Sequence, residues 1–165
     1  MTIPILLSAH RRAEITDKIR VETGIDEAMI ELLVDRFYAR IRADALLGPI
    51  FASRIVDWAP HLAQMRAFWS SVVLMSGSYH GQPMQKHMPL PVDGQHFDHW
   101  LALFETTARE TCPPAAADHF IERARRIAQS LELAVASAHG IRLRFGERYA
   151  RTGIQLETAS LESAG

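Results

Sequence analysis

Histidine is the residue type in this sequence with the widest scope for chemistry, because its imidazole can bind a metal ion or exchange a proton near neutral pH. The chain holds eight histidines. Most histidines on helices are surface or core residues, so the surroundings of each one must decide its role. His96 and His99 form an i, i+3 pair with Asp93 and Asp98 as the neighbouring carboxylates, and the chain has no HExxH arrangement. A metal site built on that pair is therefore disfavoured.

His87 differs from the other histidines because its segment would hold the ring in a defined place. Three glycines and three prolines fall between Gly77 and Gly94, so no long helix can form there and only a turn over residues 84–88 remains. The string MPLP follows His87 directly, and its prolines stop the turn and fix the direction of the chain.

Polar atoms also interrupt the apolar faces of three expected helices. His61, Met65 and Trp69 stand at i, i+4 and i+8, so they line one edge of a helix with a polar group at its head. Tyr38 places a hydroxyl, and Trp100 an indole N–H, on the apolar faces of two others. A buried tyrosine or tryptophan must find a partner for its polar atom, and that partner can be structural or a bound ligand.

Apolar residues recur at three- and four-residue spacing in four stretches, which predicts four main helices. These helices are expected at about residues 25–41, 57–77, 95–112 and 115–139. Thr23 with Asp26 is a start signal for the first helix, and Asp57 can cap the second. The Gly-Pro pair in LGPIF, residues 47–51, forces a compact corner between them. No stretch alternates with period two, so we expect an all-α chain without strands.

The composition indicates one globular domain. At 165 residues the chain is long enough to bury a core and enclose a ligand. The 18 Lys and Arg balance 19 Asp and Glu, so neither nucleic acid nor an anionic membrane surface is an expected partner. No segment approaches the ~18 apolar residues of a membrane span, and the N-terminus lacks the order of a secretory signal. A single cysteine, Cys112, suits a reducing compartment, so we expect a cytoplasmic protein.

Several sequence strings, taken in order, are together more specific than any single residue. They are RFYARIRAD, LGPIF, the pattern WxxHxxxxxxFW from Trp58 to Trp69, YHGQPMQKHMPLP and HFDHWLALF. Over roughly residues 25–139 this combination resembles the truncated haemoglobins of the third group, within the globin superfamily. The KH-x-x-LP string with a downstream F-x-x-W-L is typical of that group.

The resemblance implies a fold and a cofactor. The fold is an all-α truncated globin, a two-over-two helical sandwich around one haem b, in which the proximal helix has shrunk to a turn. The globin domain would cover residues 25–139, between an N-terminal arm at 1–24 and a C-terminal tail at 140–165. We expect the arm to hold at most one short helix. Removal of residues 151–165 should cost little core and leave haem affinity nearly unchanged.

The resemblance also assigns residues to the haem. His87 matches the proximal histidine that binds the iron, and Lys86 matches a position that can reach a propionate. Tyr38, His61 and Trp100 match the distal positions that stabilise a bound ligand. The other implied haem-contacting residues are Phe37, Phe51, Met65, Phe68, Trp69 and Leu90. No residue is assigned a catalytic role.

A histidine-ligated haem with a polar distal side implies reversible binding of O2, NO and CO, and detoxification of NO or peroxide. Tyr38 and Trp100 are the expected donors, and His61 is either a third donor or a gate. Several donors slow ligand release, which suits redox chemistry better than simple oxygen transport. The alternative is a haem enzyme, an NO dioxygenase or a peroxidase-like enzyme, that needs an external reductase. A helical interaction protein with coincidental histidines is the third interpretation.

Overall fold

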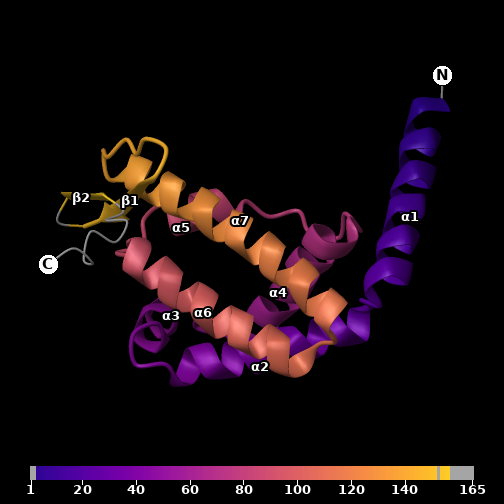
Figure 1. Cartoon of the computed structure of the whole chain (residues 1–165), viewed down its shortest axis with the longest axis horizontal. Coiled ribbons are helices and arrows are strands. Elements are labelled where there is room, and N and C mark those ends of the chain that lie inside the picture. Colours follow the sequence, from indigo (N-terminus) through magenta and orange to yellow (C-terminus); the bar gives the residue numbers. More distant parts are fainter. Residues whose placement is uncertain (1–2, 152, 157–165) are drawn as a thin grey trace, which may run out of the picture. The chain divides into compact units, whose positions relative to one another are not determined.

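A computed structural model describes residues 3–151 and 153–156, with side chains described for residues 8–151. These residues form seven helices and one short two-stranded sheet, so the predominantly helical class is confirmed (Figure 1). The helices are α1 (Ile3–Thr23), α2 (Glu27–Ala43), α3 (Gly48–Arg54), α4 (Trp58–Leu74), α5 (Pro83–His87), α6 (Gly94–Thr111) and α7 (Pro114–Ala138). The strands are β1 (Glu147–Ala150) and β2 (Gly153–Leu156). Among the described helices, none is both long and apolar enough to cross a bilayer.

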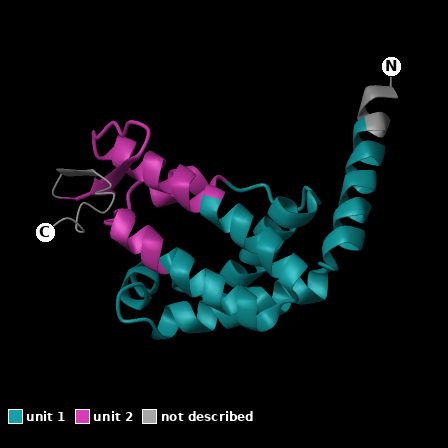
Figure 2. Cartoon of the chain, in the orientation of Figure 1, with its two compact units in different colours: residues 1–81, 100–125 teal, residues 82–99, 126–165 magenta. Residues whose placement is uncertain are grey.

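The chain divides into two compact units, which Figure 2 shows in different colours. Unit 1 comprises residues 1–81 and 100–125, and unit 2 comprises residues 82–99 and 126–165. Unit 1 therefore holds α1 to α4, unit 2 holds α5 and both strands, and α6 and α7 each contribute residues to both units.

Helices α2 and α4 pack against each other in unit 1, and both begin at aspartate caps. The Asp26 carboxylate accepts the Met29 N–H at 2.8 Å, and Asp57 caps α4 as expected. Thr23, expected to share in starting α2, instead ends α1 and donates its hydroxyl to the Ile19 carbonyl. The apolar stripe expected along α2 is buried except at its first residue, Met29, which is half-buried. The buried members are Ile30, Leu33, Val34, Phe37, Tyr38 and Ile41.

The expected corner between α2 and α4 contains a seven-residue helix, α3, that packs against α2. The Asp44 carboxylate accepts the N–H groups of Leu46 and Leu47 at 3.0 and 2.8 Å, which turns the chain into α3. A Cβ on Gly48 would lie only 2.9 Å from the Arg42 carbonyl oxygen. Glycine is therefore the residue that allows this close backbone approach.

An aromatic core joins α2, α4, α6 and α7 within unit 1. The rings of Trp69 and Phe104 stack with centroids 4.8 Å apart, and Phe104 meets Phe37 edge-on at 5.1 Å. Trp69 also contacts Phe120, at 6.2 Å. None of these four side chains is more than 2% exposed, so their burial stabilises the packing of the four helices in this unit.

The N-terminal arm differs from the sequence-based expectation. It forms α1, a 21-residue helix rather than a short one. Most of its described side chains are exposed, and it packs against α4, where the Thr16 hydroxyl donates to the Leu74 carbonyl at 2.6 Å. Thr16 and Leu74 are 58 positions apart in the sequence. A long-range hydrogen bond thus stabilises a helix whose own apolar pattern is weak.

The expectation of no strands is wrong in the C-terminal region. β1 and β2 pair antiparallel, with Glu147 opposite Leu156 and Ala150 opposite Gly153. Tyr149 in β1 is 4% exposed, so this hairpin brings an aromatic ring into unit 2. We also expected residues 151–165 to add little to the core. The side chains after residue 151 lie outside the described part of the chain.

Candidate functional site

His87 closes α5, a five-residue helix in unit 2, as the sequence predicts for a turn at this point. Its Nδ1 lies 2.6 Å from the Pro83 carbonyl oxygen. Because a carbonyl oxygen only accepts hydrogen bonds, Nδ1 must carry the proton. This contact fixes the plane of the imidazole. It leaves Nε2, with its free lone pair, as the ring atom that can bind a metal.

The surroundings of His87 favour a neutral ring. Burial lowers its pKa, and although the hydrogen bond to Pro83 acts in the opposite direction, the charge of Lys86 lowers the pKa further, so the net shift is downward. A second contact holds the turn, since the Leu90 N–H donates to the His87 carbonyl at 3.0 Å. The neutral imidazole is the form that acts as a metal ligand.

A second group of predicted site residues gathers around Tyr38 in unit 1. The Tyr38 ring meets His61 edge-on, with centroids 5.4 Å apart, and lies 5.2 Å from Phe37 and 6.1 Å from Phe51. Trp58 completes the group, at 6.1 Å from Tyr38 and 5.6 Å from His61. The structure thus brings together Phe37, Tyr38, Phe51 and His61, four predicted site residues that come from three separate sequence strings.

The Tyr38 hydroxyl keeps its proton across the physiological pH range. Its side chain is 5% exposed, and burial raises its pKa far above the usual value. A protonated phenol among aromatic rings is a hydrogen-bond donor in a site of low dielectric constant, where water does not compete for the bond. This group can therefore stabilise a polar ligand.

Trp100 joins the Tyr38 cluster through Phe37. The Trp100 ring meets Phe37 edge-on at 5.5 Å and stacks on Phe104 at 5.6 Å. Trp69 also stacks on Phe104, at 4.8 Å, and Phe68 meets Trp69 edge-on at 5.6 Å. The remaining predicted residues are Met65 and Leu90, which are half-buried, and Lys86, which is exposed.

Sequence reasoning missed two features of these sites. The first is the Pro83 carbonyl, and the signal for it was the proline four residues before His87, a spacing that places one residue beneath another within a helical turn. The second is Trp58, which begins the string WxxHxxxxxxFW but was not predicted to be a site residue. Its i, i+3 relation to His61 could have indicated the contact, and the Arg42 guanidinium lies over its ring at 4.6 Å.

Comparison with known sequences points in the same direction. The sequence model of the bacterial-like globin family matches residues 22–133. The group 3 truncated hemoglobin ctb of Campylobacter jejuni is 34% identical over 113 residues, which are 66% of this chain and 89% of that protein. The group 2 truncated hemoglobin YjbI of Bacillus subtilis is 32% identical over 81 residues, which are 48% of this chain and 61% of that protein.

Solved structures give the same result. The crystal structure of a group III truncated hemoglobin from Campylobacter jejuni superposes with a TM-score of 0.62 at 34% identity, covering 66% of this chain and 89% of that one. The group II truncated hemoglobin from Bacillus anthracis, at 24% identity and a TM-score of 0.55, supports the fold alone. The resemblance inferred from the sequence strings is confirmed. The chain belongs to the bacterial-like globins, as a truncated haemoglobin of the third group, and this membership supports a general role in haem-based ligand binding.

Proposed function

We propose that this protein binds haem b through His87 and uses it to bind O2, NO and CO reversibly. One observation carries the proposal, the hydrogen bond from the Nδ1 proton of His87 to the Pro83 carbonyl. Histidines that ligate metals almost always donate their second ring N–H to a carboxylate or a carbonyl, which fixes the tautomer and the ring orientation. His87 has this arrangement, and Nε2 is the atom it presents as a ligand.

Other residues fit the remaining needs of this cofactor. A porphyrin requires apolar surface for its faces and benefits from a cation near its propionates. Phe51, Met65 and Phe68 are half-buried side chains of unit 1 that offer apolar surface, and Leu90 does so in unit 2. Lys86 is exposed and adjacent to His87 in sequence, so its ammonium suits a propionate.

When bound, haem supplies an iron that takes diatomic ligands and exchanges electrons. The neutral His87 imidazole would hold the iron through its Nε2. The Tyr38 hydroxyl, which retains its proton, would donate to a bound ligand, with Trp100 as a second donor and His61 as a third donor or a gate. A polar ligand such as O2 gains about 1.5–3 kcal/mol from a hydrogen bond of this kind, and the less polar CO gains less.

Donors that hold a ligand also slow its departure, so we further propose that the protein turns over NO or peroxide rather than transporting oxygen. The buried, proton-bearing Tyr38 favours this assignment. The turnover would draw electrons from a reductase that is a separate protein.

Absorption spectroscopy of the purified protein tests the proposal. The ferric, ferrous and CO-bound forms should each show a Soret band at its own position, and removal of CO or O2 should regenerate the ferrous spectrum. Titration of the apoprotein with haem should saturate at one haem per chain. A protein that gives no Soret band after haem addition would refute haem-based ligand binding and leave a helical interaction protein as the better description.

A further inference from the structure

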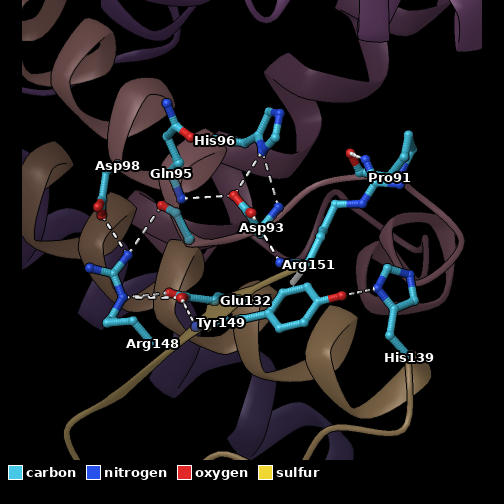
Figure 3. Close-up of polar contacts among 11 residues, drawn as sticks. Pro91, Asp93, Gln95, His96, Asp98, Glu132, His139, Arg148, Tyr149 and Arg151 are labelled. Atoms are coloured by element: carbon cyan, nitrogen blue, oxygen red, sulfur yellow. Dashed lines mark hydrogen bonds and ion pairs between the residues drawn. The ribbon is translucent and has the colours of Figure 1, made fainter. Parts of the chain in front are cut away.

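The C-terminal hairpin, described at residues 147–151 and 153–156, lies beyond residues 22–133 that match the globin family, yet it is hydrogen-bonded to the segment that follows His87. That segment, residues 91–98, is termed the Asp93 segment, and it joins α5 to the first turns of α6. Both parts belong to unit 2. Figure 3 shows the polar side chains that meet where the hairpin docks on the Asp93 segment.

Arg148 in β1 makes the most extensive of these contacts. Its Nη2 donates to the Asp98 carboxylate at 2.6 Å and to the Gly94 carbonyl at 3.2 Å. Its Nε donates to both oxygens of Glu132 on α7, at 3.0 and 3.1 Å (Figure 3). One guanidinium thus ties the hairpin to the start of α6 and to α7, a geometry that suits the fixed fork of arginine.

Glu132 shows that the hairpin is an integral part of unit 2. Glu132 is 7% exposed, and its carboxylate accepts hydrogen bonds from Arg148 and from the Tyr149 N–H, the latter at 2.9 Å. A buried carboxylate is tolerated only when it is paired and hydrogen-bonded. The acid lies within the family match, while these two partners come from the extension. A chain without the hairpin would leave this carboxylate without either partner.

A second link reaches the Asp93 segment closer to His87. The Arg151 N–H donates to the Asp93 carboxylate at 3.2 Å, and the Arg151 guanidinium donates to the Pro91 carbonyl at 3.4 Å. Asp93 also accepts the Gln95 N–H at 3.1 Å, so the same carboxylate starts α6. The hairpin therefore holds both the start of α6 and the chain entering it.

Close packing leaves no room between the hairpin and the start of α6. A Cβ on Gly94 would lie 2.6 Å from the Glu132 carboxylate oxygen, 3.0 Å from the Tyr149 carbonyl oxygen and 3.2 Å from the Arg148 guanidinium. Glycine at this position is what allows the hairpin and Glu132 to approach the helix so closely.

The chain between His87 and Asp93 is short and has little conformational freedom. Five residues, 88–92, stand between His87 and Asp93, and two of them are prolines whose φ angles are fixed. The Leu90 N–H is bonded to the His87 carbonyl, and Val92 is 6% exposed. The chain between His87 and Asp93 is therefore short and restricted, so a displacement of the Asp93 segment should also displace the turn that carries His87.

We propose that Arg148 and Arg151 are positioning residues for His87, because they hold the Asp93 segment and so restrain the turn that presents the imidazole. The role toward haem rests on the proposed function, whereas the restraint itself is a property of the protein alone. The hairpin is thus a proximal-side brace supplied by the part of the chain beyond the globin match.

The test compares Arg148→Ala and Asp93→Asn with the native protein. Arg109→Ala is the matched control, since Arg109 makes an ion pair with Asp118 at 2.6 Å within unit 1. Two readouts report on His87: the iron–imidazole stretching band in the resonance Raman spectrum of the ferrous protein, and the rate of haem transfer to apomyoglobin. Amide hydrogen exchange of residues 87–98 in the haem-free protein reports on the restraint without any cofactor.

We expect Arg148→Ala to shift or broaden the iron–imidazole band, to speed haem transfer about ten-fold, and to raise exchange across residues 87–98. Asp93→Asn should act in the same direction with a smaller effect, and Arg109→Ala should leave the band and the exchange of these residues unchanged. Arg148→Lys, which keeps the charge but not the fork, should restore the native values only in part. If Arg148→Ala does not fold, the comparison of Asp93→Asn with the native protein decides the test.

Two results would overturn the inference. One is a native band and native exchange in both Arg148→Ala and Asp93→Asn. The other is faster haem transfer in Arg148→Ala and Arg109→Ala alike with no change in the band, which indicates a general loss of stability. The proposed function fails separately, by the absence of haem binding to the native protein, and in that case hydrogen exchange in the haem-free chain still decides whether the hairpin restrains the turn.

Discussion

Tyr38→Phe removes one hydroxyl from the centre of the proposed distal side while it keeps the ring. The ring is 5% exposed and packs edge-on against Phe37 and His61, so the substitution should preserve these contacts. The proposed hydrogen bond would run from this buried donor to a partly charged ligand, and its loss should cost about 1.5–3 kcal/mol. Because 1.4 kcal/mol corresponds to a factor of ten, O2 should dissociate about 10- to 100-fold faster.

Stopped-flow dissociation of O2 and of CO from the ferrous protein measures this effect. CO is the internal control, because it accepts a weaker hydrogen bond and its rate should change much less. Trp100 reaches the same cluster through Phe37, so Tyr38→Phe combined with Trp100→Phe reveals any compensation between the two donors. A change of less than about two-fold in the O2 rate of both variants, or an equal change for CO, would refute the reasoning and return Tyr38 to the role of a core aromatic.

Four further predictions concern stability, each measured by urea unfolding. Phe104→Ala removes a 1% exposed ring that stacks on Trp69 and should cost about 3–5 kcal/mol. Gly48→Ala forces a Cβ against a backbone oxygen at 2.9 Å and should cost about 1–3 kcal/mol. Asp57→Ala removes the cap of α4 and should cost about 0.5–2 kcal/mol. Burial alone would raise the pKa of Asp93, yet hydrogen bonds from the Arg151 N–H, His96 and the Gln95 N–H lower it below 3.8. Its stabilising contribution is therefore present above about pH 4 and lost as pH falls through the folded-state pKa, and Asp93→Asn should flatten the stability curve in that range.

The main helices and part of the site could be predicted from the sequence because they follow local rules. The stripe along α2 is regular, and it places Phe37 and Tyr38 on the buried face. Proline and glycine around His87 limit the chain to a turn, which is what α5 is. The four-residue spacing from Pro83 to His87 could also have predicted the hydrogen bond between them.

The ends of the chain could not be predicted because distant contacts stabilise them. The hairpin is held by Arg148, whose partner Asp98 lies 50 residues earlier, and its strands have only four residues each. Helix α1 has no strong apolar stripe, and Thr16 finds its partner at the end of α4. Charge pairing and long-range hydrogen bonds of this kind leave no periodic pattern in the sequence.

The ferrous absorption spectrum of His87→Gly, recorded with and without added imidazole, tests the assignment of the proximal ligand most directly. His80→Ala is the control, since His80 is an exposed histidine on the chain leading to α5. The native protein and His80→Ala should share one spectrum of a histidine-ligated ferrous haem. His87→Gly should lose that spectrum and release haem faster, and imidazole should restore it. Retention of the native spectrum and of haem by His87→Gly without imidazole would show that another side chain ligates the iron.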